Sequence, residues 1–125
     1  MDAKNVIRIA SDSARNIFRL SFGGDIGVEE MSRAGQTIAE AMVAVRPGFY
    51  LLTDLSRLNS MDVQCMPYIA STMELASNHG IARVVRIIPD RSKDIGFNIM
   101  SLFHYPHGLP IITCEDEAEA DRALR

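Results

Sequence analysis

Two short, nearly unbroken runs of apolar residues limit the fold of this chain more than any other feature. They are FYLLT (49–53) and IARVVRII (81–88). Runs of this kind are typical of strands that are covered on both faces in a parallel sheet. Between them, apolar residues from Val63 to Ala76 recur at helical spacing. We therefore predict a βαβ unit in which the two runs form adjacent parallel strands.

The sequence before this unit predicts a hairpin and a helix. VIRIA (6–10) and NIFRLSF (16–22) nearly alternate between apolar and polar residues, and the residues between them have turn composition. GGDIG (23–27) is short and rich in glycine, so we predict that it ends the strand and turns the chain toward a helix. Helical spacing of apolar residues then covers residues 28–45.

The sequence after the unit predicts two further helices and one strand. Phe97, Met100 and Phe103 share one face of a predicted helix, and residues 109–113 form a predicted strand. The last segment, 114–125, predicts a helix whose acidic first turn suits the helix dipole.

This order of elements predicts an α/β fold. We expect a mixed, mostly parallel sheet with an N-terminal β-hairpin and about four helices. The 125 residues suit one domain, 1–125, and the hydrophobic fraction of 47% is enough for a core without disulfides or metal. Cys65 and Cys114 lack metal-ligand spacing, so we expect two buried thiols, no metal site and no cofactor.

Charge and hydropathy patterning argue against several classes of partner. The net charge is −3, from 13 basic and 16 acidic residues without a block of like charge, so we expect no nucleic acid partner. No apolar run approaches the about 20 residues of a membrane span, and the first ten residues alternate instead of forming a signal core. We therefore expect no membrane span and a cytoplasmic location.

The polar segment TDLSRLNSMD (53–62) is the candidate functional site. It follows a predicted parallel strand, and loops at the carboxyl ends of such strands usually carry function. Leu58 and Met61 alternate with polar residues, a mixture typical of protein interfaces, and Asp62 is placed to cap the next helix. The predicted partner-binding residues are Ser56, Leu58, Ser60, Met61, Asp62 and Gln64.

Asp54 supports a minor alternative. Its predicted position at a strand end resembles the phosphoacceptor of a response-regulator receiver domain. A receiver also needs paired acids after its first strand to bind magnesium, because the metal neutralises charge during phosphoryl transfer. Here only Asp12 follows that strand, and a hairpin replaces the expected helix.

Three stretches together resemble the STAS domain, the family named for sulfate transporters and anti-sigma-factor antagonists. They are LLTDLSRLNSMDVQCM (51–66), GIARVVRIIP (80–89) and GLPIITCEDEAEADRAL (108–124). The resemblance follows the order of elements over residues 5–124. It implies a regulatory domain that binds a protein partner and is not an enzyme.

The chain departs from this family at one position of consequence. The family's antagonists are phosphorylated on the second serine of Asp-Ser-Ser-Gly, and that motif falls here on Asp62, Val63, Gln64 and Cys65. Gln64 has no hydroxyl group, so we predict that the usual serine switch is missing. A divergent SpoIIAA-like branch of the family is similar in length and also lacks the motif.

That branch shares its topology with lipid-carrying domains of the Sec14 type, which implies a second function. A small apolar ligand could be held by some of the seven methionines together with Phe97, Phe103 and Tyr105. The sequence is compatible with both functions.

Overall fold

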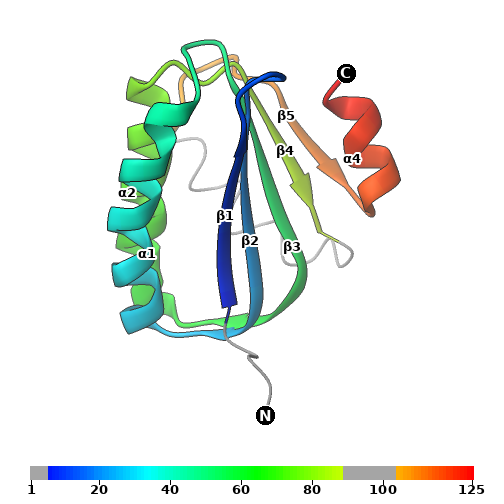
Figure 1. Ribbon diagram of the computed structural model, residues 1–125. Coiled ribbons are helices and arrows are strands. Elements are labelled where there is room, and N and C mark those ends of the chain that lie inside the picture. The colour runs from blue at the N-terminus through cyan, green and yellow to red at the C-terminus, as the bar shows by residue number, and fades with distance from the viewer. Residues whose placement is uncertain (1–5, 89–103) are drawn as a thin grey trace.

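The computed structural model describes residues 6–88 and 104–125. Five strands form one sheet in the order β1-β2-β3-β4-β5. Two helices cover one face of this sheet, and a short C-terminal helix lies on the other face (Figure 1). The strands are β1 (Val6–Asp12), β2 (Ile17–Ile26), β3 (Tyr50–Met61), β4 (Arg83–Ile87) and β5 (Ile111–Cys114).

The strand directions confirm the predicted α/β class and the mixed sheet. β1 and β2 form the antiparallel hairpin, whereas β2, β3, β4 and β5 are parallel to their neighbours. The predicted βαβ unit is present, because β3 and β4 are adjacent and parallel from Tyr50 opposite Arg83 to Asp54 opposite Ile87.

Three α-helices occur in the described residues, against about four predicted. They are α1 (Val28–Ala41), α2 (Met66–Asn78) and α4 (Glu117–Ala123). Short 3-10 turns, Met42–Ala44 and Val63–Cys65, follow α1 and precede α2. The predicted helix that carries Phe97 and Phe103 lies outside the described residues. Within the described part of the chain, no helix is both long and apolar enough to cross a membrane.

Two strands extend beyond their predicted ends, and the two errors have the same cause. The segment 23–27, predicted as a turn, continues β2 as far as Ile26, and the segment 56–62, predicted as a loop, continues β3 as far as Met61. The two extensions pair with each other, from Gly23 opposite Arg57 to Ile26 opposite Met61. Neither segment has the composition of a strand, so each depends on the other for its conformation.

Irregular pairing explains why glycine and polar residues are tolerated in these extensions. The register shifts between Ser21 and Gly23 and again between Gly24 and Asp25. Such bulges place extra residues on one strand and commonly use a glycine with positive φ, and Gly24 has φ of +80°. The glycines therefore bend the strand pair without ending it.

The main core lies between the sheet and the layer formed by α1 and α2. Alternate residues of β2, Phe18, Leu20 and Phe22, point into it, as the alternation of the sequence predicts. A smaller apolar cluster on the opposite face lies under α4 and includes Leu52, Val85 and Leu124. Both cysteines are buried and unpaired, Cys65 in the main core and Cys114 under α4. This confirms the prediction of two buried thiols.

The end of α2 is fixed by one glycine. Gly80 has φ of +95°, a conformation that favours glycine, and a Cβ atom there would lie 2.9 Å from Cβ of Pro47. Its carbonyl accepts a hydrogen bond of 2.7 Å from the N–H of Gly48. The turn before β3 and the turn before β4 therefore pack directly on each other.

Candidate functional site

The extended ends of β2 and β3 are joined by side chains as well as by the backbone. Oδ1 of Asp25 accepts hydrogen bonds of 2.7 Å from Nδ2 of Asn59 and from the hydroxyl of Ser60. The N–H of Asp62 donates to the carbonyl of Ile26 at 2.9 Å. The candidate segment is thus held on a strand and is not a free loop.

Asp62 fixes the turn that opens α2. Its Oδ1 accepts a hydrogen bond of 2.8 Å from the N–H of Gln64, and its carbonyl accepts one of 2.9 Å from the N–H of Cys65. Pro67 occupies the first turn of α2, where its missing N–H costs no helical hydrogen bond. Asp62 therefore acts as a cap, as predicted, but it caps the 3-10 turn that leads into α2, and the N-cap residue of α2 itself is Cys65.

The six predicted partner-binding residues divide into two groups. Ser56, Ser60, Asp62 and Gln64 are exposed. Leu58 and Met61 are half-buried and pack against the main core. The core therefore covers most of the apolar surface of these two side chains.

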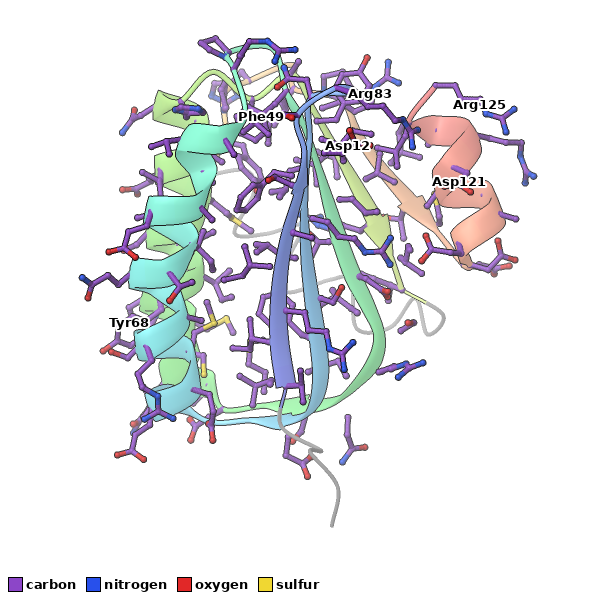
Figure 2. The ribbon with its side chains drawn as sticks, in the orientation of Figure 1. Asp12, Phe49, Tyr68, Arg83, Asp121 and Arg125 are labelled. Atoms are coloured by element: carbon purple, nitrogen blue, oxygen red, sulfur yellow. The ribbon has the colours of Figure 1, made fainter. Side chains whose placement is uncertain are left out.

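Val63 and Tyr68 supply exposed apolar surface that the sequence did not indicate. The exposed fractions are 76% for Val63 and 37% for Tyr68. Figure 2 shows Tyr68 on the outer side of the helical layer. The helical spacing from Val63 to Ala76 predicted that Val63 faces the core, which is wrong. Residues 63–65 form a 3-10 turn, and its tighter winding turns Val63 away from the face that α2 buries.

Asp54 lies inside β3, so the strand-end position that suggested a receiver domain is wrong. Its Oδ2 is 3.0 Å from Nη2 of Arg19, and its Oδ1 accepts hydrogen bonds from the N–H and hydroxyl of Ser56 at 3.0 and 2.6 Å. Burial alone raises the pKa of Asp54, but the hydrogen bonds from Ser56 and the charge of Arg19 outweigh it. The pKa of this carboxyl therefore lies below its ordinary value.

Arg19 also attaches α4 to the sheet. Its Nη2 is 2.6 Å from Oε1 of Glu117, in the first turn of α4. At the other end of α4, Nη1 of Arg83 donates a hydrogen bond of 2.8 Å to the carbonyl of Ala123. The guanidinium of Arg83 lies 4.7 Å from the centre of the Tyr50 ring. Both ends of α4 are thus held by arginines of the sheet.

A polar hollow of about 940 Å³ lies over β1, β2 and β3 beside the start of α4. Its lining includes Arg8, Arg19, Asp54 and Glu117, and the glycines of β2. In residues 6–88 and 104–125, no group of three or more histidine, cysteine or acidic side chains is placed to hold a metal ion.

Solved structures match this arrangement over nearly the full length of the chain. A Shewanella loihica PV-4 protein of the DUF3478 family, described as having a SpoIIAA-like fold, has a TM-score of 0.71 and 15% identity and covers 100% of this chain and 99% of its own. The chain has the SpoIIAA-like fold. No protein-family model and no curated protein matches it by sequence.

Anti-sigma-factor antagonists share this STAS-like, SpoIIAA-like fold. SpoIIAA in its unphosphorylated form has a TM-score of 0.64 and 17% identity and covers 94% of this chain and 97% of its own. An anti-sigma factor antagonist from Mycobacterium paratuberculosis has a TM-score of 0.61 and 20% identity and covers 100% of this chain and 99% of its own. At these identities the likeness establishes the fold, which confirms the resemblance drawn from the sequence.

Proposed function

We propose that this protein is a non-enzymatic regulatory domain that binds a protein partner where β3 passes into α2. The surface consists of three exposed members of the predicted set together with the newly recognised apolar residues. We name it the α2-start surface: Ser60, Asp62, Val63, Gln64, Pro67 and Tyr68. Ser56, the fourth exposed member, instead lines the hollow beside α4, where its hydroxyl donates to Asp54. Leu58 and Met61, which complete the predicted set, support this surface from below.

The observation that carries the proposal is the exposure of Val63 in a turn that is held rigid. An apolar side chain that is 76% exposed gains free energy when a partner covers it. Asp62 holds the turn through two hydrogen bonds, so little ordering is needed on association. Tyr68 follows five residues later, in the first turn of α2, and is of a residue type enriched in protein interfaces.

We further propose that this surface is not controlled by phosphorylation of a serine in the 3-10 turn before α2. One matched structure is the Bacillus cell fate determinant SpoIIAA in its phosphorylated form. At the position that the family motif assigns to the phosphorylated serine, this chain has Gln64. The nearby hydroxyls of Ser56 and Ser60 donate to Asp54 and Asp25, so an added phosphate would meet a carboxylate at either position.

Binding of a small apolar ligand is less well supported by the described residues. The hollow beside α4 is lined by arginines and acids, which suits polar groups. Tyr105, proposed from the sequence to line an apolar pocket, belongs to the main core, and its burial raises its pKa to about 12. Phe97 and Phe103 lie outside the described residues.

Two valine substitutions test the proposed surface. Val63 and Val43 are exposed to 76% and 79%, and each lies in a 3-10 turn beside one of the long helices. In Figure 1, the end of α1 and the start of α2 lie at opposite ends of the helical layer. Val63→Glu and Val43→Glu therefore add the same charge at matched but distant positions.

We expect a partner captured from native lysate to be retained by the wild type and by Val43→Glu, and to be lost by Val63→Glu. Unfolding curves would establish that both variants are folded. Equal retention by the two variants would exclude the α2-start surface. Capture of no protein, with a lipid found in the native mass spectrum, would establish the apolar-ligand function instead.

Phosphopeptide mapping of the protein from its native cell tests the missing switch. We expect no stoichiometric phosphate on residues 56–66. Stoichiometric phosphate on Ser56 or Ser60 would show that the switch has moved along the chain and has not been lost.

A further inference from the structure

The two edge strands of the sheet differ in length and in how well they are blocked from pairing with another chain. β5 is an edge of four residues, and Pro110, which lacks an N–H group, precedes it directly. β1 is an edge of seven residues without proline, and among the described strands it pairs only with β2. Long edges with unpaired backbone groups can pair with another chain unless they are blocked.

The side chains of β1 divide cleanly between its two faces. Ile7 and Ile9 pack against the main core. Arg8, Ala10 and Asp12 are exposed, and Figure 2 shows Asp12 on the side of β1 that faces α4. A strand added beside β1 would therefore meet a charged residue, a small residue and a charged residue of opposite sign along one face.

We propose that β1 is a homodimer interface, in which a second copy of this chain pairs with it antiparallel about a two-fold axis at Ala10. In this register Arg8 of each copy lies opposite Asp12 of the other, and the two Ala10 residues lie opposite each other. The charged pair thus occurs twice by symmetry, and the sheet runs continuously through both copies.

Charge complementarity selects this register over its neighbour. An axis at Ile9 would place Arg8 opposite Ala10 and leave the charges unmatched. Within the described residues Arg8 makes no ion pair, and Asp12 accepts one hydrogen bond, of 3.0 Å, from the N–H of Arg15 through Oδ1. Oδ2 of Asp12 is therefore available to the guanidinium of the second copy.

The opposed charges allow a complementation test by sedimentation of the full chain. We expect a wild-type particle of twice 13.8 kDa. Arg8→Asp or Asp12→Arg alone should weaken dimerisation about tenfold or more, because both symmetric pairs become like-charge pairs. An equimolar mixture of the two variants should dimerise again, since each acid then meets a base. A wild type that is monomeric at all concentrations, or a mixture no tighter than its components, would overturn the proposal.

Cross-linking tests the register directly, because both native cysteines are buried. Directly opposed residues of antiparallel strands have Cα atoms about 4.5–5.5 Å apart, within the range of a disulfide. Ala10→Cys should therefore cross-link rapidly under mild oxidation. Ser11→Cys is the matched control, since the two substituted positions would lie about 8 Å apart in this register. Cross-linking of Ser11→Cys as fast as Ala10→Cys would contradict the axis at Ala10.

Discussion

The two faces of the sheet are held by different kinds of interaction. The face toward α1 and α2 is covered by apolar side chains from every strand of the sheet. The face toward α4 has a small apolar cluster under that helix and, beside it, the ion pairs of Arg19 with Asp54 and Glu117. Figure 1 shows that α4 lies on the side of the sheet opposite the two long helices.

This difference separates the residues that stabilise the protein from those that position one helix. Burial of apolar surface contributes most of the folding free energy, so the sheet face toward α1 and α2 should dominate global stability. Partly exposed ion pairs contribute little, so the α4 face should tolerate substitution more readily. Of the four predictions below, three test this division and one concerns the turn before α2.

The largest expected effect comes from adjacent residues of β2 that point to opposite faces. Phe18 is fully buried on the helical face and Ile17 is 7% exposed on the α4 face. Phe18→Ala should lower the free energy of unfolding by about 3–5 kcal/mol, and Ile17→Ala by about 2 kcal/mol. Urea unfolding measures both changes. Equal losses would show that the two faces contribute alike.

A smaller effect is expected where Arg83 holds the end of α4. Arg83→Met keeps an unbranched side chain but lacks the guanidinium, so it removes the hydrogen bond to Ala123 and the cation–π contact with Tyr50. The expected loss is about 1–2 kcal/mol. Amide hydrogen exchange should rise mainly in α4. Arg122→Met, at an exposed position of the same helix, is the control. An equal rise in α1 would contradict a local role for Arg83.

The cap of the 3-10 turn before α2 should contribute less again. Asp62→Ala removes the acceptor for the N–H of Gln64 and should cost about 1 kcal/mol of stability. Asp62→Asn should recover most of this loss, because an amide oxygen can still accept the hydrogen bond. If both variants lose the same stability, the charge of Asp62 and not its capping bond is responsible.

The smallest expected effect is the pH dependence due to Asp54. Its folded pKa is lowered from the ordinary value of 3.8, so its charged form stabilises the fold. That stability is fully present above about pH 4 and is lost as the pH falls through the lower folded pKa. The stability difference between wild type and Asp54→Asn should therefore shrink below about pH 4. A difference that stays constant down to low pH would contradict this role for Asp54.

The sequence predicted the parts of the fold that depend on local periodicity. Alternation in β1 and β2 and the unbroken apolar runs of β3 and β4 were sufficient for the α/β class and for the parallel pair. Asp62 was recognised as a cap from its position before a helical pattern. Each of these signals lies within a few consecutive residues.

Prediction of the conformation of residues 56–62 was less successful, because this conformation depends on pairing between distant segments. Residues 57–61 have a polar composition that resembles a loop, yet they form a strand because Gly23 to Ile26 pair with them. The same pairing and the 3-10 turn after it direct Met61 toward the core and Val63 toward solvent. No local pattern in the sequence indicates that Met61 faces the core and Val63 faces solvent.

The sequence by itself therefore determined the order of the described strands and helices and the apolar residues of β2, β3 and β4 that enter the core, because both follow from hydrophobic periodicity. Only the tertiary structure decided how far β2 and β3 extend and which residues are exposed where α2 begins. It also brought Arg19, Asp54 and Glu117 together from three separate elements. The physical reason is that bulges and ion pairs form between segments far apart in the chain, where the composition of neither segment specifies its partner.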